Sequence, residues 1–190
     1  SNNSVTVTDP GSAWQITGGG VLRFGWETSG VNRLVISNGG MVANGDCPIG
    51  YVSGANSNSV LVTGAGSIWS NSGALGVGAG TNHLNTLTVV DGGRLYSGGA
   101  ASFIGKGGSN NSVLVSGGNA TWNAGGQMLI VGGAGGTNNL LCIDGQGVEG
   151  GAIVTNVSGL VVGTNGGANF NNLIVTNGGK LFSTAGAYVG

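Results

Sequence analysis

Short apolar segments recur along the whole chain, separated by Gly, Asn and Ser. Examples are "VLV" at 113–115, "RLYS" at 94–97 and "LIVG" at 129–132. Segments of this length that alternate in period two and are rich in Val, Ile, Leu and Thr predict β-strands. No stretch of ten or more residues places apolar side chains at helical spacing. We therefore expect short strands joined by tight turns, and no helix.

Two landmarks repeat at a constant period. Successive apolar-Gly pairs place their glycines 25 to 31 residues apart, and the motif Asn-x-[Val/Leu]-x-[Val/Ile] recurs in step with them. Both markers divide the chain into seven units of about 27 residues. The apolar-Gly pairs are Phe24-Gly25, Ile49-Gly50, Val77-Gly78, Ile104-Gly105, Val131-Gly132, Val162-Gly163 and Val189-Gly190, and the units start at Asn3, Asn32, Asn58, Asn85, Asn111, Asn139 and Asn171.

The units also alternate in type. One type carries a Trp eleven residues after its Asn, as at Trp14, Trp69 and Trp122. The other carries a Gly-Gly turn, as in "NGGMV" at 38–42 and "DGGRL" at 91–95. The unit at 139–170 departs from the pattern, because "GQGVEGG" at 145–151 inserts about four residues at a turn.

Three short strands per unit predict an all-β fold, a parallel β-helix (β-solenoid) of seven coils that forms a single domain over 1–190. Coils stack at about 4.8 Å, and crossover chirality favours a right-handed coil. We expect the seven Asn side chains to pile into a hydrogen-bonded ladder, as amides do in cross-β assemblies. The interior would be filled by alternate residues of the first strand, namely Val60, Val62, Leu87, Val89, Val113 and Val115.

Composition narrows the range of partners. The chain has 44 Gly, only 6% charged residues and a net charge of −1, so it has no basic surface for nucleic acid and little self-repulsion. No apolar run approaches the roughly 18 residues of a membrane span, so we expect no membrane insertion. Hydrophobic residues make up 39% of the chain, which favours an ordered fold over a glycine-rich disordered one.

One repeat class matches these units. The segment "VLVTGAGSIWSNSGALGVG" at 60–78 followed by "LTVVDGGRLYSGG" at 87–99 resembles the autotransporter (type V secretion) and PEP-CTERM-associated β-solenoid repeat, and the resemblance fails only around 145–159. It implies a bacterial protein that is extracellular or at the cell surface, usually a stalk or adhesin segment of a longer protein. It brings no catalytic residues and no cofactor.

The residues that could carry chemistry are few. His83 is the single histidine and falls in the corner "GTNHLN" at 80–85, where we expect a solvated side chain. Asp91 occupies a turn position and should be satisfied locally. Asp144 and Glu149 lie together on the irregular coil, where an ion is a minor alternative. Carboxylates are too scarce for a typical glycosidase site, so we expect no enzyme, no metal and no catalytic residue.

Cys47 and Cys142 fall four coils apart, roughly 19 Å at about 4.8 Å per coil, which is too far for a mutual disulfide. We expect buried thiols, with an intermolecular bond as the alternative.

Two surfaces are candidates for binding. Trp14, Trp69 and Trp122 on alternate coils would be spaced by about 10 Å and could stack on sugars if they face outward, with packing at a coil corner as the alternative. Outward positions of the first and third strands are largely apolar, which is typical of an interface. The candidate interface residues are Leu61, Leu114, Ile174, Phe103, Ile130, Val161 and Tyr188.

Neither end of the sequence carries a polar cap, so we expect a slice of a longer solenoid or head-to-tail stacking into a filament. The function expected from the sequence is structural: an extracellular fibre, filament or stalk that associates with itself. The alternative is an adhesin that binds surface glycans, and a polysaccharide-degrading enzyme ranks third.

Overall fold

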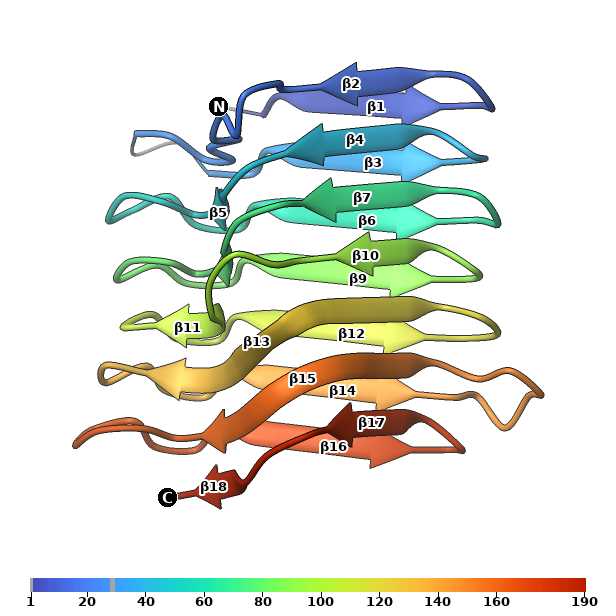
Figure 1. Cartoon of the computed structure of the whole chain (residues 1–190). Helices are drawn as coiled ribbons and strands as arrows, with labels where there is room; N and C mark the ends of the chain where they lie inside the picture. Colours follow the sequence, from blue (N-terminus) through green and yellow to red (C-terminus); the bar gives the residue numbers. More distant parts are fainter. Residues whose placement is uncertain (1, 28–29) are drawn as a thin grey trace.

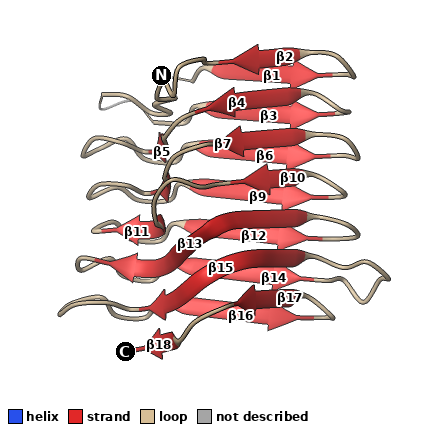
Figure 2. Ribbon diagram, in the orientation of Figure 1, coloured by secondary structure: helices blue, strands red, loops and turns tan. Residues whose placement is uncertain are grey.

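The chain is a parallel β-solenoid of about seven turns with no helix in its described residues (Figures 1 and 2). The computed structural model describes residues 2–27 and 30–190. Ser1, Thr28 and Ser29, which belong to the predicted domain 1–190, lie outside the described residues. The predicted fold class and the period of about 27 residues are confirmed.

The first strand of every coil belongs to one seven-stranded parallel sheet. Each strand of this sheet has five residues, and each pairs with its neighbours without a register shift. In sheet order, its strands are β1 (Ser4–Thr8), β3 (Arg33–Ser37), β6 (Ser59–Thr63), β9 (Thr86–Val90), β12 (Ser112–Ser116), β14 (Leu140–Asp144) and β16 (Asn172–Thr176).

The second and third strands of the coils form the other faces. The second strands are β2 (Ala13–Gln15), β4 (Met41–Asn44), β7 (Ile68–Asn71), β10 (Arg94–Tyr96) and β17 (Lys180–Ser183). The third strands are β5 (Cys47–Ile49), β8 (Leu75–Val77), β11 (Ser102–Lys106) and β18 (Ala187–Val189). The long strands β13 (Thr121–Gly133) and β15 (Ile153–Val162) each run through both positions.

The continuous strands β13 and β15 differ from the prediction of three separate strands in every coil. In the fifth and sixth coils the strand continues around the corner between the second and third positions, and the pairing of β13 with β15 shifts register between Asn123 and Gln127 and again between Gln127 and Met128. In the first coil the third strand is reduced to a single bridge from Phe24 to Ile49.

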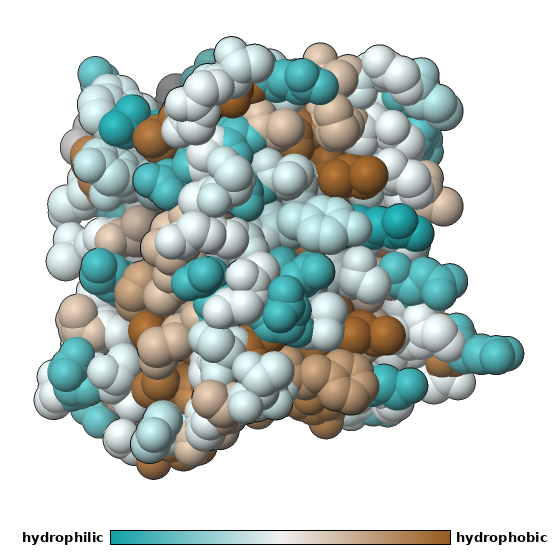
Figure 3. All heavy atoms as spheres, viewed as in Figure 1, coloured by the Kyte–Doolittle hydropathy of each residue, from teal (hydrophilic) through white to brown (hydrophobic). Residues whose placement is uncertain are grey.

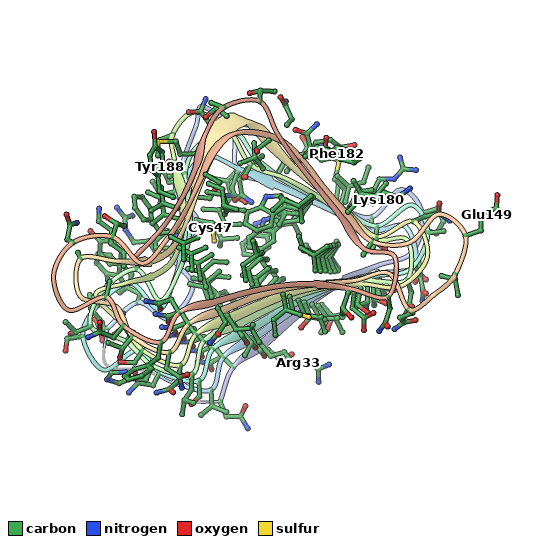
Figure 4. The ribbon with its side chains drawn as sticks, turned by 90° about the horizontal axis from the view of Figure 1, so that it is seen from below. Arg33, Cys47, Glu149, Lys180, Phe182 and Tyr188 are labelled. Carbon is green, nitrogen blue, oxygen red and sulfur yellow. The ribbon has the colours of Figure 1, made fainter. Side chains whose placement is uncertain are left out.

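Seen along the axis, the coils have a three-sided cross-section whose interior is filled by side chains (Figure 4). In Figure 1 the more distant first strands run to the right and the nearer second strands to the left while the chain descends, which is a right-handed coil. The handedness is the one that crossover chirality favours.

The core consists of vertical rows in which like residues lie over like. In the first sheet one inward row includes Leu34, Val60, Leu87, Val113 and Leu141, all at most 1% exposed. In the second strands a Trp alternates with an aliphatic residue as far as Val154, and the inward row reads Trp14, Val42, Trp69, Leu95, Trp122, Val154 and Leu181. Alternating volumes in one row let the rings interdigitate with the aliphatic side chains above and below them.

The irregular sixth coil is confirmed. Residues 145–152 join β14 to β15, whereas 91–93 suffice between β9 and β10. Figure 4 shows the result, because Glu149 lies at the tip of a loop that projects beyond the other turns.

The turn after the first strand explains its Asn or Asp. Asp9, Asn38, Asp91 and Asn177 occupy this position in four coils, and all four have a φ between +48° and +75°. Asn and Asp tolerate the left-handed region better than other residues with a side chain. The left-handed backbone conformation therefore explains why Asn or Asp occurs here. The sequence alone predicts a different reason, namely local hydrogen bonding of the side chains.

Candidate interaction surface

The predicted asparagine ladder is present as a continuous chain of hydrogen bonds. Each Nδ2 donates to Oδ1 of the Asn one coil further on, at 2.8 to 3.1 Å. The same Oδ1 also accepts the backbone N–H of the preceding Asn, at 3.0 to 3.3 Å. The members are Asn3, Asn32, Asn58, Asn85, Asn111, Asn139 and Asn171.

Most of this ladder is closed to solvent. Asn58, Asn85, Asn111 and Asn139 are 0% exposed. The Nδ2 of each also donates to a backbone carbonyl of a nearby loop, as Asn58 Nδ2 does to the Ala55 carbonyl at 3.0 Å. A buried amide is stable only when its polar atoms are paired. The ladder is therefore an internal support that fixes the register of the outer faces.

The tryptophan stripe predicted for sugar stacking is wrong for its two inner members. Trp69 and Trp122 are 0% exposed, because they fall on the inward parity of β7 and β13. Their indole N–H groups donate to Asn44 Oδ1 and to Ser97 Oγ, both at 2.9 Å. Trp14 is half-buried against the same core. The alternative, packing inside the coil, describes all three.

These two hydrogen bonds account for the alternation of unit types. The acceptor comes from the coil before the Trp, where the second strand carries an aliphatic residue in the inward row. Trp69 and Trp122 therefore each follow a unit that provides space and an acceptor for the ring.

The predicted interface positions all lie in two outward rows. Pairing places Leu61, Leu114 and Ile174 in the first-strand row, which reads Thr6, Val35, Leu61, Thr88, Leu114, Cys142, Ile174. The third-strand row contains Pro48, Gly76, Phe103, Ile130, Val161 and Tyr188 in register.

Solvent exposure varies along each of the two rows. Ile174 is 45% and Tyr188 67% exposed, and the inner members of both rows are partly buried by their neighbours. Figure 3 shows hydrophobic atoms gathered toward the lower left, over the region where β11, β13, β15 and β18 lie in Figure 1. We call Phe103, Ile130, Val161 and Tyr188 the apolar stripe.

The N-terminal part of the same face holds an aromatic and cationic cluster that the motifs did not single out. Trp26 and Tyr51 stack with ring centroids 5.2 Å apart and planes 9° apart. The Arg23 guanidinium lies over both rings, 4.8 Å and 5.4 Å from their centroids. Trp26 and Tyr51 remain 49% and 42% exposed.

A sequence signal for this cluster exists. Trp26 and Tyr51 each follow the Gly of an apolar-Gly landmark, and Ala79 and Lys106 occupy the same position in the next two coils. Backbone hydrogen bonds from Tyr51 to Gly25 and from Ala79 to Gly50 place these residues in one column. Reading the residue after each landmark Gly would have found it.

The other candidate groups do not gather into a site. His83 is exposed, and its backbone N–H donates to Asn56 Oδ1 at 2.8 Å. Asp144 Oδ1 already accepts from the Gln146 N–H and from Asn177 Nδ2, at 2.9 and 3.0 Å. Over residues 2–27 and 30–190, no group of three or more His, Cys, Asp or Glu side chains could hold a metal ion.

Both cysteines are free. Cys47 is 0% exposed and points into the core, as Figure 4 shows, and burial, with a smaller contribution from Asp46, raises the pKa of its thiol. Cys142 lies in the outward first-strand row and is half-buried, so the prediction of buried thiols holds for Cys47 and is wrong for Cys142. Burial, followed by Asp144, raises the pKa of Cys142.

Comparisons with known proteins give little. No family model and no curated protein matches the chain. A solved structure of a TibC-catalysed, hyper-glycosylated fragment of TibA aligns over 99% of this chain and 94% of its own, at 14% identity and a TM-score of 0.20. A similarity of this size carries no argument about fold or function. Within the described residues, no helix is long and apolar enough to cross a membrane.

Proposed function

We propose that the chain is a structural extracellular β-solenoid, a rigid segment of a fibre or stalk at a bacterial cell surface. The observation that carries the proposal is the unbroken register from β1 to β16, with the asparagine ladder beside it. A coil of this kind buries its apolar and amide rows only against its neighbours, so stability accumulates along one axis. Such a protein provides length and stiffness.

The resemblance of 60–78 and 87–99 to the autotransporter and PEP-CTERM-associated repeat supports the extracellular location. The proposed role is mechanical and not enzymatic. The buried polar groups of the ladder and of the Trp69 and Trp122 side chains are paired within the core, where they serve stability.

Self-association would use the apolar stripe, with a second copy of the chain as the occupant. Copies with a net charge of −1 and 6% charged residues repel one another weakly. Ile130 and Val161 are adjacent in register, so side-by-side solenoids could interdigitate their stripes over several coils.

The test compares the purified chain with the variant Ile130→Lys/Val161→Lys, which changes two members of the apolar stripe, using light scattering and negative-stain electron microscopy. The unmodified chain should form bundled rods or fibres, and the variant should stay dispersed while its circular dichroism remains that of β-structure. A chain that stays monomeric at high concentration, or a variant that assembles equally well, would reject lateral packing.

A further inference from the structure

The third-strand face carries a groove of about 320 Å³ in its N-terminal half, separate from the apolar stripe except at Phe103. Two adjacent columns line it. One column reads Arg23, Pro48, Gly76 and Phe103 in successive coils. The other contributes Tyr51, Ala79 and Lys106, and Trp26 stacks on Tyr51 outside the lining of the groove.

The groove exists because the residues in the middle of both columns have small side chains. Pro48, Gly76 and Ala79, with Ala74, make a low floor between the Arg23 end and the Phe103 end. A Cβ added at Gly76 would already lie 3.1 Å from the Cβ of Ala79. The two ends are three strand spacings apart, roughly 14 Å. The hollow is therefore elongated along the solenoid axis and suits a segment of a linear chain.

The walls offer exposed aromatic surface and positive charge. Arg23 lies over Trp26 and Tyr51, and Lys106 Nζ lies 4.7 Å from the Phe103 ring centroid. Both cations are exposed, and their contacts in the structure are with these rings. Because both side chains are exposed, an anionic ligand can reach their N–H groups.

The charge of the groove is opposite to that of the chain. Its lining contains Arg23 and Lys106 but only one acid, Asp46, whose Oδ1 accepts the Ala74 N–H at 2.7 Å. Glu27, which follows Trp26, does not line it. Two of the chain's five basic residues thus lie in one groove of a protein with a net charge of −1.

We propose that this groove binds an acidic polysaccharide, with its carboxylates on Arg23 and Lys106 and a sugar face against the Tyr51 ring. Arg binds carboxylates through paired, charge-assisted hydrogen bonds. Single-stranded nucleic acid, the competing occupant, presents a phosphate at every nucleotide and requires a basic track along the groove. Two cations at opposite ends of a floor made of Pro, Gly and Ala fit a sparsely charged ligand better.

The probe is a defined oligogalacturonate, compared by calorimetry with its neutral methyl ester and with a single-stranded oligonucleotide. Binding of the acid should be at least about tenfold tighter than that of the ester, and should weaken with added salt. Measurements at concentrations where light scattering shows a monomer keep binding separate from the proposed self-association.

Four variants locate the site. Arg23→Gln and Lys106→Gln should each weaken binding of the acid by about tenfold, and Gly76→Phe should abolish it by filling the floor. The matched control is Arg94→Gln, an exposed Arg on β10 of another face, which should leave affinity unchanged. Circular dichroism checks that each variant is folded.

Equal affinity for acid and ester, no binding of either, or equal loss in Arg94→Gln would overturn the proposal. Tighter binding of the oligonucleotide than of oligogalacturonate would overturn it too, in favour of a nucleic-acid site.

Discussion

Gly50 makes room for the side chain of Asn85. A Cβ on Gly50 would lie 2.6 Å from Nδ2 of Asn85 and 2.8 Å from the carbonyl oxygen of Ala55. The same relationship joins Gly25 to Asn58 and Gly78 to Asn111. The two landmarks that mark the repeat are therefore the two sides of one contact, which is why they keep the same period.

Gly50→Ala should lower the free energy of unfolding by about 2–4 kcal/mol. Roughly 1 kcal/mol comes from placing a side chain at φ +71°, and about 1–3 kcal/mol comes from displacing the buried amide of Asn85. Urea unfolding followed by circular dichroism measures the loss. The control is Gly135→Ala, because Gly135 has φ +84° but nothing within 4 Å of its ideal Cβ. Equal losses at both positions would show that the contact with Asn85 contributes nothing.

Asn85→Ala should interrupt the ladder. Asn85 Oδ1 accepts hydrogen bonds from the backbone N–H of Asn58 at 3.0 Å and from the Nδ2 of Asn58 at 2.9 Å. Truncation leaves both buried donors without this acceptor, at about 1–3 kcal/mol each, so we expect the free energy of unfolding to fall by about 2–6 kcal/mol. Asn172→Ala is the comparison, because Asn172 is exposed and its Nδ2 donates to the nearby Phe170 carbonyl. It should change stability by less than about 0.5 kcal/mol, and a loss as large as that of Asn85→Ala would contradict the role of the ladder.

The period, the strands and the register of the coils could be predicted because the residues that determine them recur in several units of the sequence. Leu61 and Leu114 are found in the same outward row because their units align without gaps. The corner of the fifth coil could not be predicted, because this coil keeps the landmarks of the repeat and yet its second and third strands form one continuous strand, β13.

The candidate site was predicted less well. The spacing of residues in the sequence shows which of them lie in one vertical row, but not whether that row faces the core or the solvent. Trp69 and Trp122 keep a perfect period, yet the turn before the second strand sets their parity inward. Trp26 was missed for a related reason: it follows a landmark Gly in a loop, outside the strand motifs. Arg23 comes from the same coil as Trp26, but the stacking with Tyr51 depends on a residue from the next coil.

Ser97→Ala should destabilise the protein through Trp122. The indole N–H of Trp122 donates to Ser97 Oγ at 2.9 Å, and both residues are buried. Removing the hydroxyl leaves the indole N–H unpaired, at about 1–3 kcal/mol, and also removes the acceptor of the buried Ser102 hydroxyl, which donates to Ser97 Oγ at 3.2 Å. Ser70→Ala on β7 provides the matched control, since Ser70 lies on the outward parity of its strand. If thermal unfolding moves by the same amount in both variants, the hydrogen bond to Trp122 has no measurable value.

The two thiols should differ in reactivity toward a disulfide reagent. Cys142 is half-buried in an outward row and should react in the folded protein, whereas Cys47 is 0% exposed and should react only on unfolding. The thiolate is the reactive form, and burial with Asp144 raises the pKa of Cys142. Its rate should therefore be below that of a cysteine peptide near pH 8 and should continue to rise above pH 9. Cys142→Ser should abolish the reaction of the folded protein, and Cys47→Ser should leave it unchanged. Modification of both thiols at one rate without denaturant would show that Cys47 is not held inside the core.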